Sequence, residues 1–196
     1  MISGQEIARA LTGSWLLFRN RPEGLHWFDR SIEGFWRSFG VFFLLVPLFG
    51  ISGLAERKLI LEETELVAEM FPDGSYWMAQ LTTFGLDWIL LPVVLALLAR
   101  PIGISRGYVA FVIARNWTSL LAAVPYVVAG LLYLAGIISS GIMVLMSLCA
   151  LAVVLWYRFN IARITLQASI SMALGIIVLD TVLSLVISEA VGRLWN

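Results

Sequence analysis

Two acidic residues, Asp87 and Asp180, lie inside stretches of sequence that are otherwise almost entirely apolar. Asp180 stands near the centre of GIIVLDTVLSLVIS, and Asp87 stands in the apolar run that begins at residue 79. An ionised aspartate at the centre of a membrane-spanning helix costs ~2.5–3.5 kcal/mol, so such a residue is expected to face the protein interior or a cavity. There it can bind a proton, a cation or a polar solute, and both residues are therefore candidates for a functional site.

Polar neighbours accompany both carboxylates at helical spacing. Gln80 and Thr83 precede Asp87 on one helical face, and Ser184 and Ser188 follow Asp180 at intervals of four. The candidate intramembrane polar site therefore consists of Gln80, Thr83, Asp87, Asp180, Ser184 and Ser188. Two interpretations stay open: hydrogen bonds that hold the helices together, or a polar vestibule open to the external side.

The elements that must position these residues follow from composition and hydropathy. Of the 196 residues, 60% are hydrophobic and 13% are charged, and several apolar runs reach the ~18 residues that a membrane-spanning helix requires. We predict an all-α polytopic integral membrane protein with an N-terminal interfacial amphipathic segment (residues 1–34) and a five-helix transmembrane domain (residues 35–196). The spans are expected at about residues 39–55, 79–99, 117–138, 141–157 and 168–188.

These boundaries place the two aspartates at matching depth. Each lies two residues from the midpoint of its span on the external side, or ~3 Å outward at 1.5 Å per residue. No basic residue is expected at that depth. We therefore predict that Asp180 faces Asp87 across the second and fifth spans, and that the two carboxyl groups share a proton.

The N-terminal segment combines a helix start with aromatic and basic residues. Ser3 and Glu6 have the spacing of a capping box. Trp15, Trp27 and Trp36 lie among arginines, a mixture typical of the headgroup boundary of a bilayer. We expect this segment to lie on the cytoplasmic bilayer surface, or to offer these tryptophans as a docking surface for a partner protein.

Orientation follows from the basic residues. Of the 13 Lys and Arg residues, only Arg57, Lys58 and Arg193 fall on the side opposite the N-terminus. The positive-inside rule then predicts a cytoplasmic N-terminus and an external C-terminus. The loop over residues 56–78 is expected to be external, and its acidic residues are Glu56, Glu62, Glu63, Glu65, Glu69 and Asp73.

Four arginines fall in the links predicted on the inner side. Arg106, Arg115, Arg158 and Arg163 are expected at the inner surface, where each is attracted to anionic lipid headgroups by ~1 kcal/mol. The strong preference for arginine over lysine suggests a bacterial genome of high GC content. We therefore expect a bacterial cytoplasmic (inner) membrane.

Several classes of function are disfavoured. The sequence has one histidine and one cysteine, and no Walker loop, dinucleotide-binding fingerprint, HExxH or GxSxG motif. We therefore expect no enzyme activity, catalytic residue, metal site or cofactor. A net charge of zero argues against a nucleic-acid partner.

The layout resembles the Yip1-like superfamily of five-span membrane proteins over roughly residues 35–191. The resemblance comes from a proline-containing third span (AAVPYVVAGLL, Ala122–Leu132), a tight turn into the fourth span, and an arginine-bearing link into the fifth (WYRFNIARITLQASISMAL, Trp156–Leu174). It implies action through partner proteins and identifies no functional residue. The acidic external loop and the intramembrane acids depart from that family.

These observations predict a non-catalytic membrane protein that serves as a partner or scaffold subunit of a membrane assembly. The lipid bilayer and other membrane proteins are its expected partners. The alternative is a small proton- or solute-handling transporter or channel that uses Asp87 and Asp180.

Overall fold

The chain is a bundle of long helices. The computed structural model describes residues 2–64 and 67–195, so the predicted external acid Glu65 lies outside the described residues. Every regular element in these ranges is helical, and five helices are long and apolar enough to cross a membrane. The predicted fold class, an all-α polytopic membrane protein with five spans, is confirmed.

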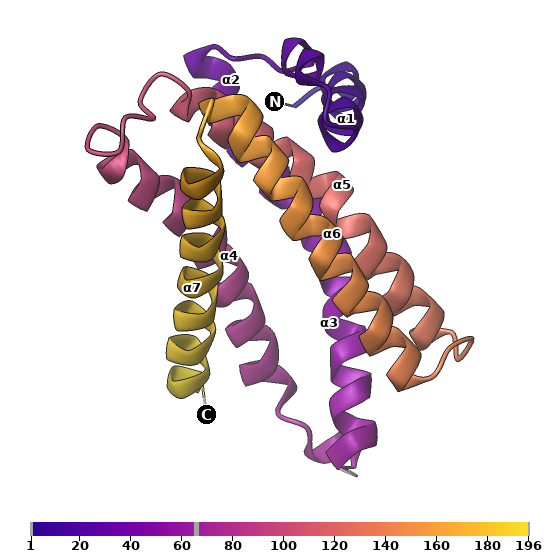
Figure 1. Cartoon of the computed structure of the whole chain (residues 1–196). Helices are drawn as coiled ribbons and strands as arrows, with labels where there is room; N and C mark the ends of the chain where they lie inside the picture. Colours follow the sequence, from indigo (N-terminus) through magenta and orange to yellow (C-terminus); the bar gives the residue numbers. More distant parts are fainter. Residues whose placement is uncertain (1, 65–66, 196) are drawn as a thin grey trace.

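Three short helices precede the long ones: α1 (Gly4–Phe18), η1 (Pro22–Trp27) and α2 (Ile32–Phe39). The Ser3 hydroxyl accepts a hydrogen bond from the Glu6 amide at 3.1 Å, which starts α1 as the capping spacing predicts. Figure 1 shows α1 and η1 lying over one end of the bundle. Tyr157 fixes α1 there, because its hydroxyl donates to the Ser14 carbonyl.

The five spanning helices are longer than hydropathy alone predicts. They are α3 (Val41–Thr64), α4 (Asp73–Leu98), α5 (Tyr108–Leu134), α6 (Ser140–Leu166) and α7 (Ile170–Trp195). The largest differences lie at the end of α3, at the start of α5 and at the end of α6, where a hydropathy pattern stops at charged residues. The helical backbone continues through Arg115 and Arg158, so both residues lie within helices and not in links.

The spanning helices form two groups. Helices α3, α5 and α6 pack together, whereas α4 packs chiefly against α7. Figure 1 shows α7 diverging from α6 toward the end that holds the C-terminus, whereas α4 approaches α3 there, where Tyr76 donates to the Gly53 carbonyl. The two groups also touch through α6 and α7, and through α4 and α5.

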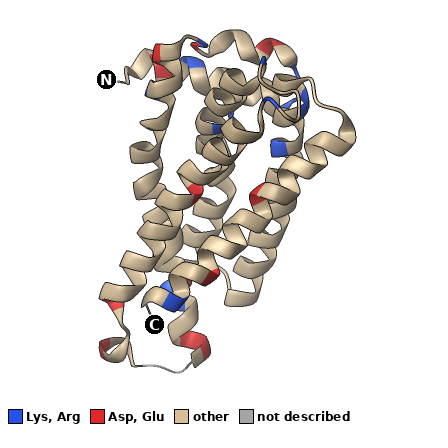
Figure 2. Cartoon of the chain, turned by 90° about the vertical axis from the view of Figure 1, so that its left-hand side faces the viewer, with Lys and Arg blue, Asp and Glu red and all other residues tan. Residues whose placement is uncertain are grey.

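The two ends of the bundle differ in charge. We call the end that carries α1 and the link over residues 99–107 the basic end, and the end that carries the 64–72 connection the acidic end. Blue basic residues gather at the upper, basic end in Figure 2, and red acidic residues dominate the lower end. Further charged residues lie between the two ends (Figure 2), inside the spanning helices.

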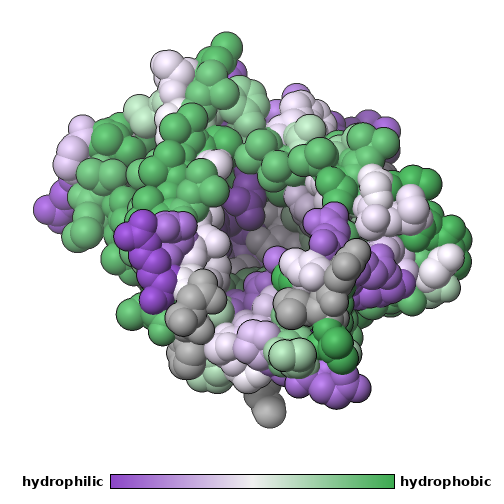
Figure 3. Space-filling model, turned by 90° about the horizontal axis from the view of Figure 1, so that it is seen from below, coloured by the Kyte–Doolittle hydropathy of each residue, from purple (hydrophilic) through white to green (hydrophobic). Residues whose placement is uncertain are grey.

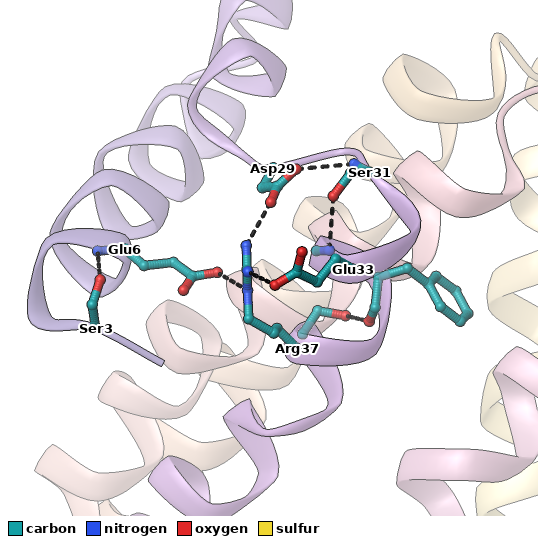
Figure 4. Close-up of polar contacts among 9 residues, drawn as sticks. Ser3, Glu6, Asp29, Ser31, Glu33 and Arg37 are labelled. Atoms are coloured by element: carbon teal, nitrogen blue, oxygen red, sulfur yellow. Dashed lines mark hydrogen bonds and ion pairs between the residues drawn. The ribbon is translucent and has the colours of Figure 1, made fainter. Parts of the chain in front are cut away.

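A single arginine joins the N-terminal segments. The Arg37 guanidinium contacts Glu6 at 3.2 Å, Asp29 at 2.5 Å and Glu33 at 2.7 Å. Figure 4 shows these three carboxylates converging on Arg37 from α1, from the chain before α2, and from α2 itself. This cluster holds α1 against the start of the transmembrane domain.

We expect the N-terminal segments to loosen in acid. The Ser31 amide and hydroxyl hold the pKa of Asp29 below its usual value, and the neighbouring Arg37 lowers it further. A carboxyl group with a lowered folded-state pKa contributes stability above its unfolded pKa of about 3.9 and loses it as pH falls. The protection of α1 amides against hydrogen exchange in nanodiscs, relative to the intrinsic rate at each pH, should therefore fall below about pH 4.

Two variants check this dependence. Asp29→Asn should weaken the pH effect by at most ~1 kcal/mol, because the side chain is largely exposed to solvent. Glu63→Gln, a change of an exposed acid at the opposite end, should leave α1 exchange unaltered. Equal protection of α1 at pH 6 and pH 3 in the unmodified protein would contradict the proposed role of the cluster.

Candidate functional site: a charged cavity between the spanning helices

All five spanning helices line one cavity of about 300 Å³, which we call the central cavity. Its walls are largely apolar, with Leu45, Phe49, Phe84 and Trp88 among the lining residues. Its polar lining residues are Asp87, Arg115, Ser119, Tyr126, Arg158, Asp180 and Ser184. The two intramembrane aspartates therefore lie at one site, as the sequence pattern suggested, together with two arginines.

Asp180 is paired with both arginines. One carboxylate oxygen, Oδ2, accepts from Nη1 of Arg158 at 2.5 Å, and the other, Oδ1, lies 3.5 Å from Nη2 of Arg115. The side chains come from three helices, α5, α6 and α7. Asp180 is only 5% exposed and Arg115 only 8% exposed, whereas the Arg158 side chain is 37% exposed.

Two expectations about these residues are wrong. We expected no basic residue at the depth of the aspartates, and we expected Arg115 and Arg158 at the inner surface on lipid headgroups. Counted from the basic end at 1.5 Å per residue, Arg115 lies about 10 Å into α5 and Arg158 about 12 Å into α6. Asp180 lies about 15 Å into α7. The difference in depth between Asp180 and each arginine is short enough for a long arginine side chain to span.

Asp87 lies beside this cluster but has a different environment. Its main-chain carbonyl accepts from Nη2 of Arg115 at 3.3 Å, whereas its buried side-chain oxygen Oδ1 has no hydrogen-bond partner among the described residues. The predicted packing of the second span against the fifth is confirmed by α4 and α7. Both oxygens of Asp180 contact guanidinium groups, so its carboxylate is paired with arginines, and the sharing of a proton with Asp87 stays a prediction.

The depth of the two aspartates also needs correction. Asp87 and Asp180 do lie at similar depth, but both are on the basic-end side of the midpoints of α4 and α7. The expected displacement was toward the opposite side. The displacement from the helix midpoints changes direction because α4 begins before residue 79 and α7 continues beyond residue 188.

The other members of the predicted polar site separate. Ser184 lines the central cavity. Gln80 lies toward the acidic end, where its amide nitrogen donates to Glu56 at 2.6 Å and to Tyr76 at 3.1 Å. Thr83 is half-buried and is not among the residues that line the cavity, and Ser188 is exposed.

Two further cavities adjoin the central cavity at Tyr126. Tyr126 lines it and also lines two neighbouring cavities, one of which includes Glu56 in its wall. Figure 3, viewed from the acidic end, shows a hollow with hydrophilic side chains inside it and a rim on which apolar and hydrophilic side chains alternate. A hollow with a hydrophilic interior is therefore present at the end that holds Glu56.

The buried Arg115 has unused hydrogen-bonding capacity. A guanidinium carries five N–H donors, and Nε and Nη1 of Arg115 have no partner in the described part of the chain. Leaving a buried donor unpaired costs ~1–3 kcal/mol, more for a charged group. The cavity is therefore suited to hold water or a ligand with hydrogen-bond acceptors.

The remaining predicted surface residues are exposed. Arg106 and Arg163 lie near the basic end, and their contact with anionic lipids stays a prediction. Trp15, Trp27 and Trp36 are 50%, 41% and 67% exposed. Among the described residues, no group of His, Cys, Asp and Glu side chains has the arrangement of a metal site.

Comparison with known proteins adds no family to this description. No protein-family model matches the chain, and neither a curated protein nor a solved structure matches it. The similarity to the Yip1-like layout therefore stays a prediction from the sequence.

Proposed function

We propose that this protein binds a small polar solute in the central cavity and handles it across the membrane without catalysing a reaction. The supporting observation is Arg115, which is almost fully buried in a cavity lined by all five spanning helices and has unpaired donors. This is the transporter or channel alternative from the sequence, with the arginines added to its site.

A purely structural role explains the cluster less well. Each charged residue at the centre of a span adds ~2.5–3.5 kcal/mol to the cost of insertion. Replacing a buried ion pair by well-packed apolar residues is often neutral or stabilising. Four charged residues beside a cavity are therefore better explained by a ligand than by packing.

The proposal includes an orientation. We infer that the protein resides in a bacterial inner membrane with its N-terminus in the cytoplasm. The concentration of basic residues at the end carrying α1 supports this orientation, by the positive-inside rule. The hollow at the acidic end then faces the external side, and we infer that the central cavity opens there.

Cysteine labelling tests both parts. Cys149, the single natural cysteine, is replaced by serine, and Ser184→Cys is added in the cavity. We expect a membrane-impermeant methanethiosulfonate to label this thiol in spheroplasts. The matched control is Val178→Cys on the same helix, a position 60% exposed on the outside of the bundle, which should label at least tenfold more slowly because lipid excludes the thiolate.

The outcomes separate orientation from function. Labelling of Ser184→Cys only in inverted vesicles would reverse the orientation and leave the cavity proposal intact. Equal, slow labelling of both positions from either side would show that no water reaches the cavity, and the solute-binding function would be rejected.

A second candidate function is the scaffold role predicted from the sequence. The three exposed tryptophans at the basic end favour it, because tryptophan is enriched at the centre of protein interfaces as well as at bilayer surfaces. We propose that this surface docks a membrane-protein partner.

Pull-down in mild detergent tests the scaffold role. A variant with Trp15, Trp27 and Trp36 replaced by serine should lose a stoichiometric partner that the unmodified protein retains, while Asp87→Asn retains it. Absence of any stoichiometric partner from the unmodified protein would contradict a scaffold role.

A further inference from the structure

We propose that the ligand of the central cavity is a zwitterion with an apolar body, in which an oxyanion binds Arg115 and an ammonium group binds Asp87. This inference rests on the proposed function and adds the chemical class of the solute. It is carried by unpaired atoms of opposite character on two neighbouring side chains.

The first of these atoms belong to Arg115. Its Nη2 is already used by the Asp87 carbonyl and lies 3.5 Å from Asp180. The N–H groups of Nε and Nη1 remain without an acceptor in the part of the chain that the structure describes, although the residue is 8% exposed and lines the cavity. A carboxylate or phosphate oxygen is the acceptor that guanidinium groups bind most strongly.

The complementary atom belongs to Asp87. Its Oδ1 is buried, lacks a hydrogen-bond partner within residues 2–64 and 67–195, and belongs to a residue that lines the same cavity. The contact between Arg115 and the Asp87 carbonyl keeps the two residues adjacent. A ligand that meets both needs must accept hydrogen bonds from Arg115 and, a few ångströms away, donate one to Asp87.

Charge balance favours a ligand with no net charge. If all four side chains are ionised, the two arginines, Arg115 and Arg158, balance the two aspartates, Asp87 and Asp180. A simple anion or cation would add an unbalanced charge at a site of low dielectric, whereas a zwitterion adds none.

The apolar walls of the cavity favour a ligand with an apolar body. Phe49, Phe84 and Trp88 line the cavity, and apolar walls with a few convergent polar groups are typical of small-molecule sites. An apolar amino acid and the headgroup of a phosphatidylethanolamine lipid share the required chemistry. The first would come from the aqueous phase and the second from the bilayer.

Binding measurements with matched probes test the class. Detergent-purified protein is titrated with L-leucine, with 4-methylpentanoate, which lacks the ammonium group, and with isopentylamine, which lacks the carboxylate. We expect leucine to bind at least tenfold more tightly than either single-charge compound. Asp87→Asn should remove this preference over 4-methylpentanoate, while Arg163→Gln, an exposed arginine outside the cavity, should not.

A second measurement identifies a lipid source. The protein is placed in nanodiscs that contain equal amounts of phosphatidylethanolamine and phosphatidylcholine, two lipids that differ in their N–H donors. Native mass spectrometry then shows which lipid stays bound after release. Selective retention of phosphatidylethanolamine, reduced in Asp87→Asn, would support the same chemistry with a bilayer ligand if leucine does not bind.

The proposal is overturned if single-charge compounds bind as tightly as leucine, or if neither leucine nor phosphatidylethanolamine is selected. Labelling of Ser184→Cys distinguishes this failure from failure of the proposed function. A labelled cavity without zwitterion binding rejects the ligand class alone, and an unlabelled cavity rejects solute binding itself.

Discussion

Replacing Asp180 by leucine is expected to lower the free energy of unfolding by about 3–5 kcal/mol, because removal of one partner of a buried ion pair leaves the other charge uncompensated. Asp180 is the carboxylate that contacts both Arg115 and Arg158. Its loss would leave two guanidinium groups facing each other across the cavity. Equilibrium chemical unfolding in mixed micelles, followed by tryptophan fluorescence, measures the change.

A double-mutant cycle separates the ion pair from simple loss of packing. Arg158→Leu combined with Asp180→Leu should cost clearly less than the two single costs added together, because the second change removes one uncompensated charge. Asp87→Asn is the control, because asparagine has the shape of aspartate and the Asp87 side chain forms no ion pair. Additive costs of Arg158→Leu and Asp180→Leu would contradict the coupling.

The second large effect is expected at Gly107, where α5 begins against the end of α6. A Cβ atom there would lie 2.5 Å from the Thr165 carbonyl oxygen and 2.9 Å from Leu166 Cα. Both are backbone atoms, so they cannot move aside as a flexible side chain can. Gly107→Ala should therefore push the two helices apart and destabilise the protein by about 1–3 kcal/mol.

Gly175→Ala on α7 is the matched control. An added Cβ at Gly175 meets nothing within 4 Å, and alanine has a higher helix propensity than glycine by up to ~1 kcal/mol. This variant should be neutral or slightly more stable in the same unfolding experiment. If Gly107→Ala were as stable as Gly175→Ala, the close contact of α5 with α6 would not exist in the membrane.

The sequence predicted the parts of the fold that depend on local pattern. Apolar length gave five spans, and the Ser3–Glu6 spacing gave the start of α1. The cost of burying a carboxylate in lipid correctly indicated that Asp87 and Asp180 face the interior. Each of these inferences needs only the residues of one helix.

The partners of Asp180 could not be predicted in this way. A hydropathy window ends at Arg115 and Arg158, and it therefore places both in links at the membrane surface. Their true position depends on three helices meeting, so that long side chains reach a common carboxylate. The only signal in the sequence was the presence of two intramembrane acids without assigned bases.

The ion-pair cluster has a consequence for the order of synthesis. Arg115 and Arg158 belong to α5 and α6, which leave the ribosome before α7 brings Asp180. Until that last helix is inserted, the two arginines lie in the nascent bundle without the carboxylate that neutralises them. The ion-pair cluster is thus complete only when α7 is inserted. A nascent chain stalled before residue 170 would present two exposed intramembrane charges to the quality-control machinery of the membrane.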